Sequence, residues 1–297
     1  MWPRICLGVM LAALAAPAQE QRVLVVTAHA GDYLVGAGGT LAALIAQGHE
    51  VYVVQVTNDE KSSAGLGPAE TQKANDEEGR EAARLLGARE VVALGHKAGE
   101  LGHLSSTELR QELFALIRYF KPRIIFIPDP YLHYDPDRDH YYVGKMAEEA
   151  WGYSGGSMFG PELARVGLAP YGAPEIYYYA VGRPYRPGEG GEGPARFRPV
   201  DITSTFERKV RAILALKTTN RLYAVETRQR LREAGPDSRL PAEFDEASSN
   251  QLTRAFLEEL AQTIGKKHGF RHGEEFNYVG FTPGLPEHIT ERAVPKR

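Results

Sequence analysis

Apolar and mixed polar segments alternate along the first half of the chain. Short runs rich in Val, Ile and Leu predict a buried strand at residues 22–27 and further strands at residues 51–56, 90–94 and 123–128. Between them, stretches with helical spacing predict helices at residues 38–47, 71–86 and about 105–120. Strands that alternate with helices at this spacing are typical of parallel sheets covered by helices on both faces. The pattern therefore predicts an α/β fold, a Rossmann-like three-layer sandwich around a mostly parallel sheet.

The second half of the chain has a weaker pattern. We expect loop at Trp151–Gly172, a strand at Glu175–Val181, an exposed excursion at Gly182–Pro199, a helix at Thr203–Arg230 interrupted near Thr218–Asn220, and a helix at Gln251–Lys267. No internal repeat, low-complexity tract or linker divides the chain. We therefore expect residues 19–297 to form one catalytic domain.

The first 18 residues have the pattern of a secretory signal. Met1–Arg4 is positively charged, Ile5–Ala16 is apolar but short for a membrane span, and Ala16–Ala18 has the small residues of a cleavage site. A buried N-terminal helix is the alternative. The signal predicts export to the periplasm or the exterior, with no stable membrane anchor after cleavage. The single cysteine, Cys6, lies in this segment, so no thiol would remain for catalysis or metal binding.

Charge narrows the choice of partners only slightly. The formal net charge is -3, and 25% of the 297 residues are charged. No long basic run is present, so a nucleic-acid partner is not expected. These values leave the oligomeric state open.

The richest chemistry follows the first and fourth predicted strands. In parallel α/β sheets, ligands bind at the C-terminal ends of the strands. His29 and Asp32 follow the first strand, and Asp137, Asp139 and His140 follow the fourth. Two imidazoles and one carboxylate with an open position suit catalytic zinc, and nearby carboxylates can orient the imidazoles. A loop histidine and a solvated acidic turn remain the alternatives when spacing alone is considered.

Five segments in this order resemble a known family. The resemblance rests on V-V-T-A-H-A-G-D with G-A-G-G-T-L-A-A-L after it, Thr57–Glu60, Arg80–Gly87, Asp137–His140 with Val143 and Gly144, and Asp201–Thr203 with Lys209 and Ala212. They are similar to the A-H-P-D-D-E…G-G-T-L-A, T-x-G-E, R-x-x-E-x-x-x-A-x-x-x-L-G, H-P-D-H-R-x-V-G and D-I-T-x-x-x-x-x-K-x-x-A motifs of the PIG-L/LmbE-like zinc-dependent de-N-acetylases. The similarity extends from the first strand to about Phe276.

The resemblance implies a function and a set of ligands. Position by position, the metal ligands of the family fall on His29, Asp32 and His140. The expected cofactor is Zn²⁺, although another divalent metal is possible. The expected reaction is hydrolysis of the amide of an N-acyl sugar or related conjugate, so the partner is a small-molecule or glycoconjugate substrate.

The acid and base groups of the family are replaced in this chain. Gly31 stands where the deacetylases have the aspartate taken as the general base, and Asp137 stands where they have the histidine thought to stabilise the oxyanion. Glu60 is the first candidate for a substitute base and Asp139 the second, although turn capping and orientation of a ligand are their structural alternatives. Asp137 is a further candidate, and His133 could serve as an acid or oxyanion donor.

Two other functions stay open. The A-H-A-x-D-Y form of the first motif also resembles the 4-oxalomesaconate hydratase-like branch, whose members add water to an unsaturated polycarboxylate. Export argues against such a catabolic enzyme, because those pathways are intracellular. The missing acid at Gly31 also allows a non-catalytic protein that binds a metal or a sugar.

Overall fold

The computed structural model describes residues 21–132, 135–181, 197–235, 241 and 243–280. Its strands are β1 (Arg22–Thr27), β2 (Glu50–Thr57), β3 (Glu90–His96), β4 (Ile124–Pro128), β5 (Glu175–Tyr179), β6 (Phe197–Asp201) and β7 (Gly273–Gly280). Its helices are α1 (Asp32–Ala46), α2 (Pro68–Leu86), α3 (Ser106–Phe120), α4 (Arg138–Ser154), α5 (Pro161–Arg165), α6 (Phe206–Ile213), α7 (Lys217–Ala234) and α8 (Glu246–His268), with a 3-10 turn, η1, at Leu101–His103.

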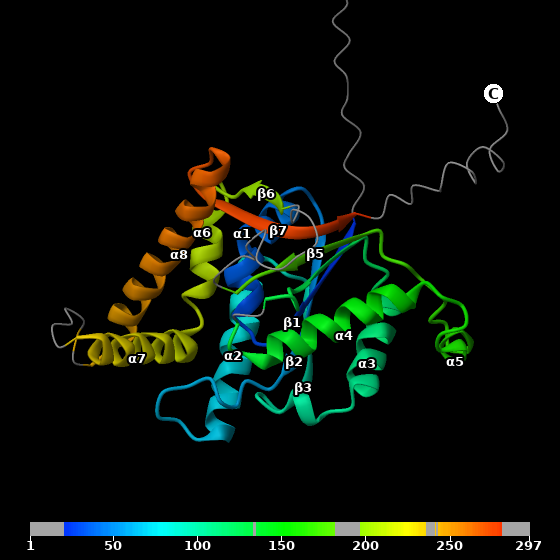
Figure 1. Cartoon of the computed structure of the whole chain (residues 1–297), viewed down its shortest axis with the longest axis horizontal. Helices are drawn as coiled ribbons and strands as arrows, with labels where there is room; N and C mark the ends of the chain where they lie inside the picture. The colour runs from blue at the N-terminus through cyan, green and yellow to red at the C-terminus, as the bar shows by residue number, and fades with distance from the viewer. Residues whose placement is uncertain (1–20, 133–134, 182–196, 236–240, 242, 281–297) are drawn as a thin grey trace, which may run out of the picture.

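The strands form one sheet in the order β3-β2-β1-β4-β5-β7-β6 (Figure 1). Neighbours from β3 to β5 pair in parallel, while β7 pairs antiparallel with both β5 and β6. This arrangement confirms the predicted α/β fold with a mostly parallel sheet. It also adds two strands, β6 and β7, that the hydrophobic pattern did not predict.

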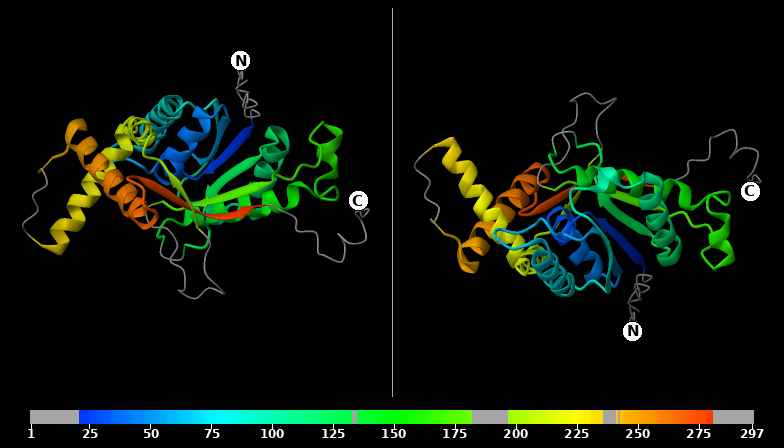
Figure 2. Two further views of the ribbon diagram at one scale, coloured as in Figure 1. Left: turned by 90° about the horizontal axis from the view of Figure 1, so that it is seen from above. Right: turned by 90° about the horizontal axis from the view of Figure 1, so that it is seen from below.

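Helices cover both faces of the sheet, as Figure 2 shows. Side chains of successive residues in a strand point to opposite faces. In β1, Val23 and Val25 therefore pack in the core under α1, α2 and α6, while Leu24 and Val26 pack in the core under α3 and α4. A strand buried on both faces needs an uninterrupted apolar run, which is why β1 could be recognised in the sequence.

The chain reverses its direction of travel across the sheet at β1. It first moves outward from β1 to β2 and β3, and then returns to place β4 on the other side of β1. The crevice at such a switch point, at the C-terminal ends of the two strands, is the usual ligand site of an open parallel sheet. Here the segments after β1 and β4 meet at this point.

The structure corrects several predicted elements. Helix α5 lies in the segment that we expected to be a loop, and α2 and α8 begin at Pro68 and Glu246, before the predicted residues 71 and 251. Helix α1 begins at Asp32, six residues before the predicted start at residue 38. Helix α4 was not predicted, and it extends to Ser154 into the segment that we expected to be a loop. Its first turn is stabilised by Asp137, whose side chain accepts a hydrogen bond from the amide of Asp139. The interruption in the long C-terminal helix lies between α6 and α7, before the predicted position at Thr218–Asn220.

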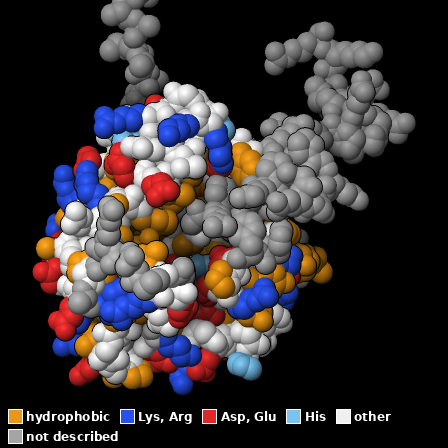
Figure 3. Space-filling model, turned by 60° about the vertical axis from the view of Figure 1, so that its left-hand side comes forward, with side chains coloured by type: hydrophobic (Ala, Val, Ile, Leu, Met, Phe, Trp, Pro, Cys, Tyr) orange, Lys and Arg blue, Asp and Glu red, His pale blue; other side chains and the backbone are white. Residues whose placement is uncertain are grey.

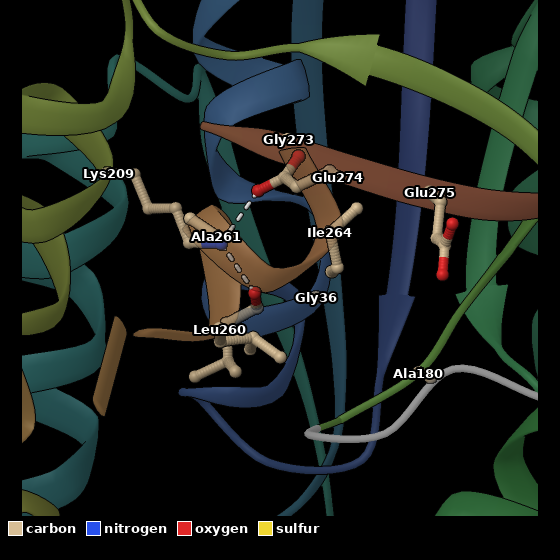
Figure 4. Close-up of a pocket in the computed structure, with 10 residues that line it drawn as sticks. Gly36, Ala180, Lys209, Leu260, Ala261, Ile264, Gly273, Glu274 and Glu275 are labelled. Atoms are coloured by element: carbon tan, nitrogen blue, oxygen red, sulfur yellow. Dashed lines mark hydrogen bonds and ion pairs between the residues drawn. The ribbon is translucent and has the colours of Figure 1, made fainter. Parts of the chain in front are cut away.

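A buried ion pair joins the second half of the chain to α1 (Figure 4). Lys209 Nζ of α6 lies 2.7 Å from Glu274 Oε1 of β7 and also donates to the carbonyl of Val35 at 2.6 Å. Glu274 accepts from the amides of Gly39 and Thr40 at 2.9 and 2.8 Å. This pair places α6 and β7 against the middle of the helix that carries Asp32 at its first turn.

Two predicted segments lie outside the described residues. They are the signal peptide at 1–18 and most of the excursion at Gly182–Pro199. In the part of the chain that is described, no helix has both the length and the apolar character needed to cross a bilayer.

Candidate metal centre

The loop after β1 holds His29 and Asp32 close together. Thr57 at the end of β2 donates its hydroxyl to the Ala28 carbonyl at 2.8 Å, which fixes the loop to the neighbouring strand. The His29 amide donates to Asp32 Oδ2 at 2.7 Å. Asp32 is also the first residue of α1, where a negative side chain interacts favourably with the helix dipole.

Three potential ligand atoms converge from this loop and from α4. Asp32 Oδ2 lies 3.2 Å from His29 Nδ1 and 3.3 Å from His140 Nε2. Ligands bound tetrahedrally to Zn²⁺ at about 2.0–2.1 Å are separated from one another by about 3.3 Å. The structure thus brings together His29, Asp32 and His140, the three residues predicted to bind the metal, at separations that suit a small divalent cation.

His140 supplies a further test of the fit. Its Nδ1 lies 2.8 Å from Asp135 Oδ2, a carboxylate that can only accept a hydrogen bond when ionised. The Nδ1 atom therefore carries a proton, so in the neutral ring Nε2 is the atom with the lone pair. This Nε2 is buried and has no hydrogen-bond partner among the described residues. A buried, unpaired nitrogen aimed at Asp32 is the arrangement expected of a metal ligand.

His29 is oriented by a second carboxylate. Its Nε2 lies 3.5 Å from Asp139 Oδ2, so Nδ1 is left to face Asp32. Asp139 is 2% exposed and also accepts a hydrogen bond from the Gly99 amide at 2.5 Å. With one oxygen facing His29 from behind, Asp139 is placed to orient this ligand, and its role as a base stays a prediction.

The electrostatics of the cluster favour a cation. Burial alone would lower the pKa of His140, but Asp32 and Asp135 outweigh it and raise that pKa to about 10. Burial would raise the pKa of Asp32, but His140 and His29 hold it well below its usual range. Carboxylates thus stabilise positive charge on the ligand atoms, and either protons or a metal ion can supply that charge.

Asp137 faces the two ligand nitrogens from the more exposed side of the cluster. Its Oδ1 accepts from the Asp139 amide at the start of α4, while Oδ2 lies 3.9 Å from His29 Nδ1 and 4.0 Å from His140 Nε2. The side chain is 42% exposed, in contrast to the buried ligands. Asp137 is therefore the carboxylate that can reach both the ligand position and a molecule arriving from solvent.

The other predicted catalytic residues lie elsewhere. Among the described residues, the Glu60 carboxylate hydrogen-bonds to Asn58 Nδ2 at 3.1 Å and to none of the three predicted ligands. This contact ties the Glu60 side chain to the turn after β2, and its role as a base stays a prediction. His133 lies outside the described residues.

Asp59 lies beside Glu60 in the same turn, and no role was predicted for it from the sequence. Its carboxylate is buried, accepts from the Ala30 amide at 2.9 Å, and lies 4.0 Å from His29 Nε2. Burial raises its pKa to about 6. The available signal was its position after β2, beside the strand that precedes His29.

The surface provides access to acidic and histidine side chains. Figure 3 shows such side chains inside a hollow on one face of the molecule. The partly exposed side chains of His29 and Asp137 open the cluster to solvent, at 15% and 42% respectively. A small molecule can thus approach from the side that Asp137 occupies.

Comparisons with known proteins identify a family and several relatives. A family model described as "PIG-L: GlcNAc-PI de-N-acetylase" matches residues 24–151, which span β1 to most of α4. Diacetylchitobiose deacetylase of Thermococcus kodakarensis is 26% identical over 271 residues, covering 91% of this chain and 86% of that protein. The 4-oxalmesaconate hydratase of Pseudomonas putida is 26% identical over 222 residues, covering 70% and 78%.

A solved structure has the same architecture over most of its length. The N,N'-diacetylchitobiose deacetylase from Pyrococcus horikoshii, in complex with its inhibitor MPG, aligns with a TM-score of 0.69 and 26% identity. The alignment covers 90% of this chain and 88% of that one, so the similarity includes the second half of the chain beyond the family match.

Proposed function

The chain contains a PIG-L family domain over residues 24–151, and on this premise we propose that it is a metal-dependent hydrolase of N-acyl groups. The proposed substrate is an N-acetylated sugar or a related conjugate. The two archaeal relatives, both named as deacetylases of diacetylchitobiose, support this class. The observation that carries the proposal is the convergence of His29 Nδ1, Asp32 Oδ2 and His140 Nε2, with Asp137 on the open side.

His29, Asp32 and His140 would hold the cation, and Zn²⁺ is the proposed one because two imidazoles and one carboxylate suit it. When bound, a divalent cation of this kind polarises a carbonyl oxygen and lowers the pKa of water. Asp135 and Asp139 hold the two imidazoles so that their lone pairs face inward. The protein thereby keeps both rings in the orientation needed before the substrate arrives.

Asp137 is the proposed general base. Water adds to the acyl carbon of the amide, and Asp137 accepts the proton that this water loses. The bond between the acyl carbon and nitrogen then breaks, and the same proton passes to the departing nitrogen. The products are a carboxylic acid and an amine, and the acid then loses its proton to solvent or to the amine and becomes a carboxylate. We prefer Asp137 to Glu60 and Asp139 because only its carboxylate faces both ligand nitrogens from the exposed side.

We also propose that the protein acts outside the cytoplasm. The proposal rests on the charged start, short apolar run and small residues of the first 18 positions. N-acylated sugars of cell envelopes and extracellular polymers would be accessible there.

The hydratase reaction is the second candidate. The relative from Pseudomonas putida and the A-H-A-x-D-Y motif favour it. Water addition to an unsaturated polycarboxylate would use the same cation but would place several substrate carboxylates near Asp137. Five aspartates already surround the two histidines, namely Asp32, Asp59, Asp135, Asp137 and Asp139, so this site is better suited to a neutral amide.

The test combines metal analysis with acetate release. Purified protein is expected to hold about one divalent ion per chain and to release acetate from N-acetylated oligosaccharides until a chelator is added. Asp137→Asn is expected to retain the metal and lose activity by about 10²–10⁴-fold, the range for a general base. Metal-loaded protein that releases no acetate but hydrates an unsaturated polycarboxylate would favour the second candidate. Full activity in Asp137→Asn would remove it as the base.

A further inference from the structure

Asp59 has a backbone conformation that favours glycine. Its φ is 52°, and Lys121 is the only other non-glycine residue with positive φ in the described part of the chain. A residue with a Cβ is uncommon in this left-handed region, although aspartate tolerates it better than most. The T-x-G-E motif that this turn resembles has glycine at the position of Asp59. The chain thus places an acid where glycine would be less strained, which suggests that the carboxylate has a role.

The carboxylate connects the β2 turn to the loop that carries His29. Its Oδ2 accepts from the Ala30 amide at 2.9 Å and from Gln55 Nε2 at 3.3 Å. Its Oδ1 lies 3.1 Å from Thr57 Oγ1 and 4.0 Å from His29 Nε2. Because the side chain is 2% exposed, these contacts are shielded from water.

The turn itself is fixed from outside. Asn75 of α2 donates its Nδ2 to the Asp59 carbonyl at 3.0 Å, and the Ser62 amide donates to the same oxygen at 3.1 Å. These bonds hold the left-handed backbone in place. Asp59 is therefore a rigid support for the loop, with its carboxylate at a fixed distance from the imidazole.

The loop after β1 lacks an acid of its own at the neighbouring position. Gly31 has no side chain, and a Cβ added there would lie 3.3 Å from Leu216 Cδ1, closer than an ordinary contact. A carboxylate could enter at residue 31 only if Leu216 moved. Asp59 instead brings a carboxylate to this loop from the adjacent strand, where it contacts the Ala30 amide and the side of His29 opposite the ligand position.

We propose that Asp59 is a positioning residue for the metal centre, which fixes the first ligand loop and the His29 ring and thereby sets the affinity for a divalent cation. It acts together with Asp139, which lies 3.5 Å from the same nitrogen of His29. The inference rests on the proposed metal site. It adds a residue that takes no part in the proposed proton transfer.

The experiment measures binding of Co²⁺ alone to the full-length protein. The affinity is obtained by competition with a chelator, and the visible spectrum of bound Co²⁺ reports the geometry of its ligands. Asp59→Gly keeps the backbone conformation without strain but removes the carboxylate. We expect it to weaken Co²⁺ binding by about 10–100-fold, the range for loss of a group that orients a metal ligand, and to change the spectrum. Lys121→Gly is the matched control, because it relieves the same conformation at the remote C-terminus of α3.

Asp59→Asn separates charge from shape. Its amide oxygen can still accept from Ala30, so the variant keeps the loop in place if Asp59→Gly fails to fold. We expect a smaller loss of Co²⁺ affinity than in Asp59→Gly, with Lys121→Gly equal to wild type. Wild-type affinity and spectrum in both Asp59 variants would overturn the inference and leave the metal site intact. Absence of Co²⁺ binding by the wild-type protein would overturn the metal site itself, and this inference with it.

Discussion

Helix α1 contacts two clusters of charged residues, one at its first turn and one at its middle, and the two clusters differ in their hydrogen bonding. At its first turn, Asp32 lies close to His29 and His140, and His140 Nε2 has no hydrogen-bond partner among the described residues. At its middle, Lys209 and Glu274 bond to each other and to the backbone of the helix (Figure 4). We call the first cluster unsatisfied, because it contains a buried nitrogen without a hydrogen-bond partner, and the second satisfied, because Lys209 and Glu274 are both hydrogen-bonded.

The difference separates a site from a structural contact. Glu274 accepts from Lys209, from two backbone amides and from the Thr40 hydroxyl, which together use its lone pairs. The cavity beside this pair is about 10 Å³, scarcely the volume of one water molecule. Burial of charge alone is therefore no sign of function. A buried nitrogen that lacks a hydrogen-bond partner, with an exposed carboxylate beside it, is a better sign of a functional site.

The variant with the largest expected effect disrupts the unsatisfied cluster. His140→Ala removes one of three ligand atoms, and two remaining ligands bind a divalent cation far more weakly. We expect the purified variant to lose its metal and its acetate release, with turnover reduced by at least about 10³-fold because the cation supplies most of the carbonyl polarisation. Metal analysis and the acetate assay measure both.

The same variant should remain folded, which distinguishes the two clusters. Removal of the His140 ring takes one neighbour from Asp135 and one from Asp32, but Asp135 still accepts from the Asp137 amide and Asp32 from the His29 amide. Thermal unfolding of the metal-free forms is expected to differ little between wild type and variant. Metal content equal to wild type in His140→Ala would show that the three residues are not the ligand set.

The variant with the next largest expected effect disrupts the satisfied cluster. Glu274→Ala leaves Lys209 buried without its counter-charge, and the amides of Gly39 and Thr40 lose their acceptor. Removal of one partner of a buried ion pair costs about 3–5 kcal/mol in the free energy of unfolding. Thermal or denaturant unfolding should show this loss, while metal content per folded chain should be retained.

Two control variants sharpen this result. Glu207→Ala removes an exposed ion pair with Arg254, and exposed pairs contribute about 0–1 kcal/mol. Lys209→Met with Glu274 intact tests the other partner, since Glu274 keeps its three donors from α1. A loss below about 1 kcal/mol in Glu274→Ala, within the range of exposed pairs, would contradict the role assigned to this cluster.

The fold could be predicted from the sequence where one physical signal dominated. The strands β1, β2, β4 and β5 are short apolar runs that are mostly buried, and β3 is a partly exposed apolar run at the edge of the sheet. Their alternation with helices implied a mostly parallel arrangement. Strand β7 was missed because Glu274 and Glu275 interrupt its apolar pattern, and both are buried only because partners elsewhere in the chain neutralise them. Such pairing is a tertiary property that a local pattern does not contain.

The candidate site was predicted only in part, for a similar reason. The predicted strand ends singled out the loops that carry His29, Asp32 and His140, and the resemblance to the deacetylase motifs named these three as ligands. Their roles as ligands stay predictions. The positions of Glu60 and Asp137 relative to these ligands depend on how two turns are folded, and Asp59 reaches His29 from a strand that is distant in sequence. Distances of this kind follow from the packing of loops, which the sequence pattern does not determine.

The smallest expected effect tests whether the unsatisfied cluster is oriented in advance. Asp135 Oδ2 accepts from His140 Nδ1, and Asp135 Oδ1 accepts from the Asp137 amide at 3.0 Å. Asn has only one acceptor oxygen, so Asp135→Asn can keep one of these bonds but not both. If the amide oxygen stays on Asp137, the NH₂ group faces His140 Nδ1 and favours the tautomer with its proton on Nε2, the atom that would bind the metal. We expect metal affinity to fall by about 10–100-fold, measured by chelator competition.

Asp76→Asn, at an exposed pair with Arg80, is the matched control and should leave affinity unchanged. Equal affinity in Asp135→Asn and Asp76→Asn would mean that His140 is free to choose its tautomer, and that the unsatisfied nitrogen is not held ready for a cation by its neighbours.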